Sequence, residues 1–205
     1  YLSDLDKTVA IDYREKAPSA ATRDLFLDEN RNYDKNKARF SLISAGVPGT
    51  VAGLSYALEK YGTLSWKEVI APSIKLAEEG FEVTHDIENV LTIYKNRLTL
   101  NQAAAEAYYK KGLVPYKAGE ILKLPDLAWS LKQIRDFGPQ AFYEGRIAKK
   151  IVAEMEKNGG LITLKDLNNY HVSERKPLKG TYKGFEIVSM PPSSSGEFIS
   201  FKCLI

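Results

Sequence analysis

The sequence predicts an α+β fold with a mostly helical middle and strands near both ends. Three patterns predict it: an alternating apolar segment at residues 7–13, helical spacing of apolar residues through the middle of the chain, and an apolar hairpin pattern at residues 181–190. With 205 residues, 44% of them hydrophobic, the chain can build one substantial core or part of a larger one. We therefore expect a single partial domain over residues 1–205.

Charge and composition narrow the possible functions. The 29 basic and 26 acidic residues are interleaved and leave a net charge of only +3, so neither nucleic acid nor an anionic membrane is an expected partner. No apolar run approaches the roughly 20 residues of a membrane-spanning helix. The first ten residues lack the apolar middle of a signal peptide. The single cysteine, Cys203, allows neither an internal disulfide nor a thiolate metal cluster.

The first elements are a strand, a loop and a helix. In residues 7–13, KTVAIDY, apolar and polar side chains alternate, as in a strand with one buried face. Residues 27–39 are polar and rich in Asn and Asp, which predicts an exposed loop. A helix should begin near Thr50 and end at Gly62. Its apolar face is predicted to carry Val51, Leu54 and Leu58.

Three glycines surround the start of that helix, in the pattern G-x-x-G-x-x-x-G. Free amides at a helix start attract anions, but this spacing is not that of the dinucleotide fingerprint, and no G-K-[ST] follows. A structural interpretation fits better. Gly46 and Gly49 would make a tight turn, and Gly53 would let the helix approach a neighbour closely.

Helices dominate residues 64–125. Ser65 and Glu68 have the spacing of a capping box, Gly80 should end that helix, and Pro72 should kink or split it. Thr84 is predicted to start the next helix, residues 101–109 a short one, and residues 110–125 an irregular segment with a short strand pair. The residues predicted to face inward are Val69, Ile70, Ile74, Ala77, Ile87, Val90, Leu91 and Tyr94.

The last third continues with helices and closes with a hairpin. Pro125 suits a first helical position, and residues 138–160 show apolar spacing of four that ends at Gly159-Gly160. Thr163 and Asp166 again have a capping spacing. Residues 181–190 read as two strands around Lys183-Gly184. The residues predicted to face inward are Leu127, Leu131, Ile134, Ile147, Ile151 and Met155.

Arg14 is the first candidate for chemistry, because it stands where the first strand ends. A guanidinium offers a planar fork of donors that matches a carboxylate at two points. From spacing alone the simpler hypothesis is a surface ion pair with Glu15, Asp12 or Asp24, since most arginines are solvated.

Serines and histidines give weaker signals. Three serines, Ser193 to Ser195, follow two prolines, and a nucleophilic serine needs a base and an oxyanion hole. A serine amidase would also need a lysine partner and a longer glycine-serine signature, so a rigid turn is the simpler interpretation. The only histidines, His85 and His171, are far apart in the sequence, and no metal site is predicted.

Several segments in order resemble one family. They are AIDYREKAPSAAT, AGVPGTVAGL, ALEKYGTLSW, PSIKLAEEGF, NGGLITLKDLNNY and YKGFEIVSMPPSSSG. Together they resemble the γ-glutamyltransferases, also called glutathione hydrolases, from Thr8 to about Gly196. The resemblance implies part of an N-terminal nucleophile hydrolase fold, an αββα sandwich, in a precursor that cleaves itself into a large and a small subunit.

The resemblance also implies a reaction and a site. The family cleaves γ-glutamyl amides such as glutathione through a threonine acyl-enzyme and transfers the acyl group to water or to amino acids, with no cofactor. The arginine of its D-[FY]-R-E segment binds the substrate α-carboxylate, which here is Arg14 within Asp12-Tyr13-Arg14-Glu15. The partners implied are a γ-glutamyl compound and the small subunit. The location implied is periplasmic or secreted.

No catalytic residue is predicted in this chain itself. The family's threonine lies downstream of the Pro-Pro-Ser-Ser turn, so residues 1–205 are expected to be a large-subunit segment that is inactive alone. Residues 197–205 depart from the family pattern and form an atypical tail. The alternatives are a non-catalytic binding or interaction module of the same fold and, more remotely, a serine amidase that uses Ser194 or Ser195.

Overall fold

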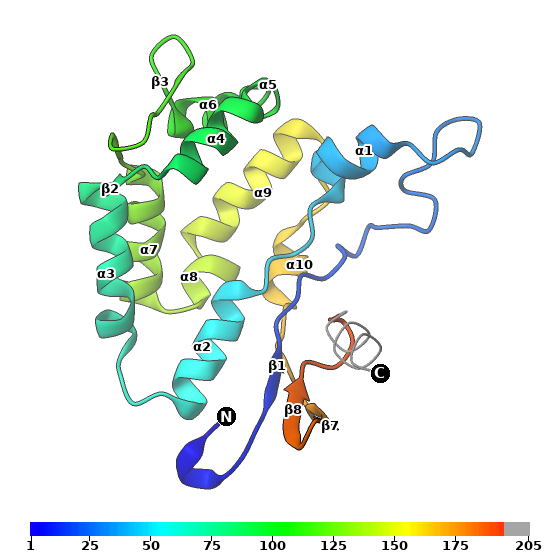
Figure 1. Ribbon diagram of the computed structural model, residues 1–205. Coiled ribbons are helices and arrows are strands. Elements are labelled where there is room, and N and C mark those ends of the chain that lie inside the picture. The colour runs from blue at the N-terminus through cyan, green and yellow to red at the C-terminus, as the bar shows by residue number, and fades with distance from the viewer. Residues whose placement is uncertain (195–205) are drawn as a thin grey trace. The chain divides into compact units, whose positions relative to one another are not determined.

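The computed structural model describes residues 1–194 (Figure 1). Two compact units are present: Tyr1–Ser65 with the segment from Phe137 onward, called unit 1 here, and Trp66–Asp136, called unit 2. The atypical tail 197–205 lies outside the described residues, so the expectation of a single partial domain over the whole chain stays a prediction. None of the helices in residues 1–194 has both the length and the apolar composition needed to cross a membrane.

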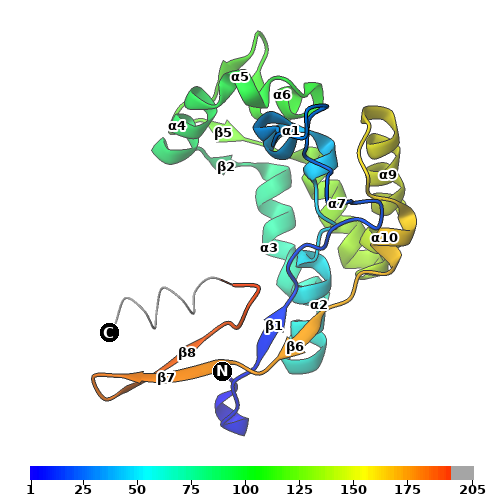
Figure 2. The same cartoon turned by 90° about the vertical axis from the view of Figure 1, so that its right-hand side faces the viewer.

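The described part of unit 1 contains two antiparallel strand pairs, of which the first joins the two ends of the sequence. Strand β1 (Ala10–Asp12) pairs with β6 (Ser173–Arg175), with Ile11 opposite Glu174. Strands β7 (Leu178–Tyr182) and β8 (Phe185–Ser189) form the predicted hairpin. Lys183 and Gly184 both have positive φ, as a two-residue hairpin turn requires. Figure 2 shows β1 beside β6 and the hairpin that follows β6.

The first strand is shorter than predicted, and its partner was not predicted. Of the expected residues 7–13, only 10–12 form the strand, because β6 offers three residues opposite them, and Lys7 instead forms an isolated bridge with Leu2. The partner segment Ser173–Arg175 is short and polar, so it has no alternating apolar pattern from which a strand could be predicted.

The described residues of unit 1 also form two 3₁₀ turns and five α-helices. They are the 3₁₀ turns η1 (Ser3–Leu5) and η2 (Leu42–Ser44) and the α-helices α1 (Lys35–Phe40), α2 (Thr50–Tyr61), α8 (Gln140–Tyr143), α9 (Arg146–Asn158) and α10 (Leu164–Asn168). Of these elements, η2, α2, α8, α9 and α10 supply residues to one core cluster. The buried residues of the cluster are Val47, Tyr143, Ala148, Val152, Met155, Ile162 and Leu167. Helix α9 ends at Gly159 in the left-handed region, as predicted, and Thr163 with Asp166 forms the predicted capping box of α10.

Two predictions about unit 1 helices are wrong. Residues 27–39 were expected to be a loop, but α1 begins at Lys35, because the Asp34 side chain accepts hydrogen bonds from the first free amides. In α2 the buried residues are Gly53 and Ser55, whereas Leu54 is exposed. The prediction is therefore wrong for Leu54, whereas Val51 packs against the core cluster. The side of α2 toward Tyr13 has room only for glycine at position 53.

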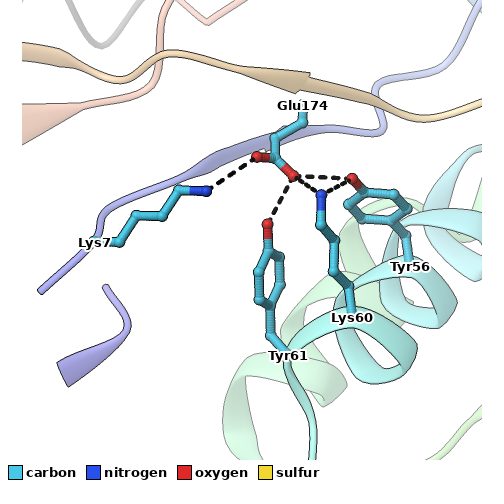
Figure 3. A network of polar contacts seen from close by, with 5 residues as sticks. All are labelled: Lys7, Tyr56, Lys60, Tyr61 and Glu174. Carbon is cyan, nitrogen blue, oxygen red and sulfur yellow. Dashed lines mark hydrogen bonds and ion pairs between the residues drawn. The ribbon is translucent and has the colours of Figure 1, made fainter. Parts of the chain in front are cut away.

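A polar cluster ties α2 to β6 (Figure 3). One carboxylate oxygen of Glu174 accepts hydrogen bonds from Lys60 Nζ at 2.6 Å, Tyr61 Oη at 2.7 Å and Tyr56 Oη at 2.9 Å. Lys7 Nζ lies 3.9 Å from the other oxygen. These bonds, with Lys60 first, lower the pKa of Glu174 to about 2 and raise that of Lys60. These bonds connect β6, the strand that pairs with β1, to α2, the helix that contacts β1.

Unit 2 is helical with two short strand pairs. Its helices are α3 (Trp66–Glu79), α4 (His85–Ile93), α5 (Lys95–Leu98), α6 (Gln102–Tyr108) and α7 (Pro125–Phe137). Strand β2 (Phe81–Glu82) pairs with β5 (Ile121–Leu122), and β3 (Tyr109–Lys110) pairs with β4 (Val114–Pro115). The predicted cap at Thr84 and the stop at Gly80 are confirmed.

The predicted inward faces in unit 2 are broader than the observed ones. Ile70, Ile74 and Ala77 of α3 are buried, but Val69, Val90, Tyr94 and Leu127 are exposed. Helix α3 also runs through Pro72 without being split, since buried Ile70 and Ile74 hold it on both sides of the proline. Apolar spacing therefore located these helices but overestimated how much of each one packs.

Candidate functional site

Arg14 lies at the rim of a cavity in unit 1, two residues beyond the end of β1. The cavity has a volume of about 550 Å³. Its lining comes from the end of β1, from the turn before α2 and from the segment after β8. The end of β1 is followed by Arg14, the turn before α2 contains Gly49, and the segment after β8 contains Ser194. The fold thus brings the first candidate of the sequence to an open hollow formed by chain segments far apart in sequence.

The backbone around Arg14 is held by four different contacts. Before it, Asp12 is the last residue of the β1–β6 ladder. The amide of Arg14 donates to Asp12 Oδ1 at 3.2 Å, and its carbonyl accepts from Tyr170 Oη at 2.8 Å. After it, Lys16 and Val47 exchange two backbone hydrogen bonds of 3.2 and 2.8 Å. The peptide that carries the guanidinium is therefore fixed although it lies outside any strand.

The side chain of Arg14 is open to solvent. Its Nε lies 3.3 Å from Glu15 Oε1, and 60% of the side chain is exposed. The surface ion pair with Glu15 considered from the sequence is thus present. An exposed pair of this kind contributes little to stability, and it engages one of the five N–H donors of a guanidinium. The remaining donors suit a planar acceptor in the cavity.

Asp12 is the charged neighbour that is most firmly paired. Its Oδ2 accepts from Arg175 Nε at 2.6 Å, and this bond lowers the pKa of the Asp12 carboxyl. Only 12% of the Asp12 side chain is exposed. Arg175 therefore keeps Asp12 ionised and balances its charge on the side of β6.

Gly49, before α2, and Gly53, within it, allow the backbone of this segment to lie close to Tyr13. A Cβ on Gly49 would lie 2.0 Å from both the Tyr13 carbonyl oxygen and Tyr170 Oη. A Cβ on Gly53 would lie 2.2 Å from Cγ of the Tyr13 ring. The structural interpretation of Gly53 is confirmed, and the neighbour that it admits is the residue before Arg14.

Two tyrosines support the site, and no sequence pattern predicted the role of either. The rings of Tyr143 and Tyr170 stack with centroids 5.7 Å apart and planes 12° apart. Tyr143 Oη donates to the Pro48 carbonyl at 2.8 Å and accepts from the Ala52 amide at 3.1 Å, one of the free amides that begin α2. Burial raises the pKa of both hydroxyls, that of Tyr170 to about 12. No local pattern could indicate partners this distant in sequence.

The other sequence candidates gain no comparable support. Ser193 and Ser194 line the cavity, and Ser195 lies outside the described residues. The described lining contains no lysine or histidine that could act as a base for a serine. His85 lies 3.9 Å from Glu88, and His171 Nδ1 lies 3.1 Å from the Asn169 carbonyl. Within residues 1–194 no three His, Cys, Asp or Glu side chains are grouped as a metal site would need.

Comparison with known proteins agrees with the resemblance seen in the sequence. The family model described as Gamma-glutamyltranspeptidase matches residues 1–204. The glutathione hydrolase proenzyme of Escherichia coli (strain K12) is 47% identical over 189 residues, which are 92% of this chain and 33% of that protein. The crystal structure of Helicobacter pylori gamma-glutamyltranspeptidase superposes with a TM-score of 0.93 at 40% identity, over 97% of this chain and 57% of that one.

A more distant structure extends the likeness in fold alone. The crystal structure of cephalosporin acylase from Bacillus halodurans has a TM-score of 0.79 at 24% identity, over 91% of this chain and 35% of that one. The predicted fold class, an α+β part of an N-terminal nucleophile hydrolase, is confirmed. The chain spans about a third of the length of the curated relatives that it matches. Since the family model covers nearly every residue of the sequence, this chain belongs to the gamma-glutamyltranspeptidase family.

Proposed function

We propose that this chain is the part of a glutathione hydrolase that binds the α-carboxylate of a γ-glutamyl substrate, and that Arg14 is the binding residue. The observation that carries the proposal is a guanidinium on a fixed backbone, exposed at the rim of a cavity. A carboxylate accepts two parallel hydrogen bonds from such a fork. The paired state of Asp12 favours this role, because Arg175 already balances the charge of this carboxylate, which lines the same cavity.

The chemistry itself requires residues from outside this chain. We propose that a threonine at the start of a small subunit attacks the γ-glutamyl amide, with its own amine as the base. The acyl group then passes from the threonine oxygen to water or to the amine of an amino acid, and the threonine hydroxyl is regenerated. This scheme agrees with the word proenzyme in the names of the relatives and needs no cofactor. Export to the periplasm or medium belongs to the same proposal.

Kinetics of the complete protein with γ-glutamyl-p-nitroanilide test the role of Arg14. We expect Arg14→Ala to raise KM at least about a hundredfold, and Arg14→Lys to recover only part of the loss, because an ammonium lacks the two-point geometry. Arg31→Ala is the matched control, since Arg31 is also exposed in unit 1 and paired with one acid, Asp24. An unchanged KM in Arg14→Ala would contradict the proposal.

The non-catalytic alternative makes a different prediction for the 205-residue chain by itself. A binding module should take up glutathione in isothermal titration and lose that binding in Arg14→Ala. A segment of an enzyme whose site is completed by other residues should give no measurable heat. The alternative is favoured only by the fact that the cavity is lined by described residues of this chain.

A further inference from the structure

Tyr170 is the residue outside the cavity that is most directly joined to Arg14. Its hydroxyl donates to the Arg14 carbonyl at 2.8 Å, although 156 residues separate the two in sequence. Tyr170 is absent from the described lining of the Arg14 cavity and instead lines a second hollow of unit 1, with Ser55, Glu59 and His171. Tyr170 can therefore act on a ligand beside Arg14 only through its neighbours, and Arg14 is the cavity residue to which it is hydrogen-bonded.

The ring of Tyr170 is held on two sides. Tyr143 stacks against one face, and the Lys16 ammonium lies 5.0 Å from the ring centroid while donating to the His171 carbonyl at 2.8 Å. Such aromatic and cation–π contacts restrict where the hydroxyl can point. The hydroxyl thus reaches the Arg14 carbonyl from a rigid support.

The absence of a side chain at Gly49 leaves the space that the Tyr170 hydroxyl occupies. A Cβ at position 49 would lie 2.0 Å from Tyr170 Oη, so any other residue there would displace the hydroxyl. Because β1 ends at Asp12, the Arg14 carbonyl has no strand partner in the β1–β6 ladder. Rotation of the peptide after Arg14 would turn its side chain relative to the cavity, and the Tyr170 bond opposes that rotation.

We propose that Tyr170 is a positioning residue for substrate binding: it orients Arg14 by donating a hydrogen bond to the Arg14 carbonyl. This inference rests on the proposed role of Arg14 and adds a residue that does not touch the substrate. Its consequence is specific. Removal of the Tyr170 hydroxyl should raise KM only for substrates that carry the α-carboxylate that Arg14 binds.

The test compares Tyr170→Phe in the complete protein with two probes: γ-glutamyl-p-nitroanilide, and 4-aminobutanoyl-p-nitroanilide, which lacks the α-carboxylate. Phenylalanine keeps the stacked ring and removes only the donor. We expect KM for the first probe to rise about fivefold, the size of one lost neutral hydrogen bond, with kcat nearly unchanged. Turnover of the second probe, followed as kcat/KM, should not change. Tyr56→Phe is the matched control, because its hydroxyl binds Glu174 instead.

A double substitution separates this inference from the proposed function. In an Arg14→Ala background, Tyr170→Phe should have no further effect, because the group it orients is gone. Equal losses with both probes, a loss that persists without Arg14, or no loss at all would each overturn the positioning role. If Arg14→Ala itself leaves KM unchanged, the proposed function fails instead.

A milder variant keeps the test decisive if Tyr170→Phe does not fold. Lys16→Met keeps the aliphatic stem over the Tyr170 ring and removes the ammonium that binds the His171 carbonyl. We expect about a twofold rise in KM for the carboxylate-bearing probe alone. No rise, or an equal change with both probes, would count against the inference.

Discussion

Gly53 lies against the ring of Tyr13 so closely that a Cβ at position 53 would be 2.2 Å from Tyr13 Cγ and 2.5 Å from Tyr13 Cβ. Both atoms belong to the residue that precedes Arg14. Helix α2 and the end of β1 therefore meet at a distance that only glycine permits at position 53. This contact links the stability of unit 1 to the placement of the candidate site.

Gly53→Ala should lower the free energy of unfolding, although helix propensity alone predicts the opposite. Alanine in the middle of a helix is favoured over glycine by about 1 kcal/mol. Overpacking against Tyr13 costs about 1–3 kcal/mol, so we expect a net loss of about 1 kcal/mol and a rise in KM. Urea unfolding and kinetics of the complete protein measure both.

Gly159→Ala is the control for this substitution. It has φ of 74° and nothing within 4 Å of its missing Cβ, so its cost is backbone strain alone. It should lower stability without changing KM. A Gly53→Ala protein that is more stable than the parent would contradict the close contact.

The Glu174 cluster should make unfolding sensitive to acid. Glu174 has its pKa lowered from 4.5 to about 2, so the stability that it contributes is complete above about pH 4.5 and is lost as the pH falls toward 2. Glu174→Gln should flatten the decline of the free energy of unfolding across that window. Denaturation curves measured from pH 5 to pH 2 provide the comparison.

Glu186→Gln is a suitable reference for that experiment. Glu186 pairs with Lys179 at 3.0 Å, and both side chains are more than half exposed. An exposed pair adds little, so its removal should leave the acid-dependent decline nearly unchanged. If both variants behave alike, the cluster at Glu174 does not control the acid response.

Sequence patterns located most elements of this fold because their signals are local. Apolar spacing and capping residues identified α2, α3 and α9, and Lys183-Gly184 identified the hairpin. Strand β6 escaped because a three-residue polar strand is defined by its partner β1 and by no pattern of its own. Apolar spacing placed Leu54 inward, although the buried residues of α2 are Gly53, which lies against Tyr13, and Ser55.

One residue of the candidate site could be predicted from the sequence, but the residues that support it could not. Arg14 was recognised through a family segment, whereas spacing alone favoured a surface ion pair, and that pair with Glu15 exists. Tyr170 and Arg175 could not be recognised, since each contacts the Arg14 region from more than 150 residues away in sequence. Such partners are determined by tertiary packing, on which a single sequence carries no direct signal.

Asp166 should contribute more to the free energy of unfolding than an ordinary helix cap does. It is 9% exposed and accepts hydrogen bonds from the amides of Ser19 and Thr163 and from the Thr163 hydroxyl. Asp166→Ala removes three hydrogen bonds to one carboxylate at once, so we expect a loss of about 2–3 kcal/mol in the free energy of unfolding. Asp34→Ala, at the cap of the short helix α1, should cost about 1 kcal/mol or less. Equal costs would show that the link to Ser19 contributes nothing.

Arg175→Met tests whether the balance of charge around Asp12 protects the candidate site. Arg175 Nε lies 2.6 Å from Asp12 Oδ2, and Asp12 lines the same cavity as Arg14. Without Arg175, the Asp12 carboxylate becomes an unbalanced charge that can pair with Arg14 and compete with a substrate carboxylate. We expect KM for γ-glutamyl-p-nitroanilide to rise about fivefold, with little change in kcat.

Asp12→Asn in the same background should reverse part of that rise. Asparagine retains an oxygen that can accept from the Arg14 amide but removes the competing charge. A purely structural role of Arg175 predicts the reverse, because the second substitution would then add damage to the first. Recovery of KM in the double variant therefore identifies electrostatic competition, and a further rise would show that Arg175 acts only by holding β6 to β1.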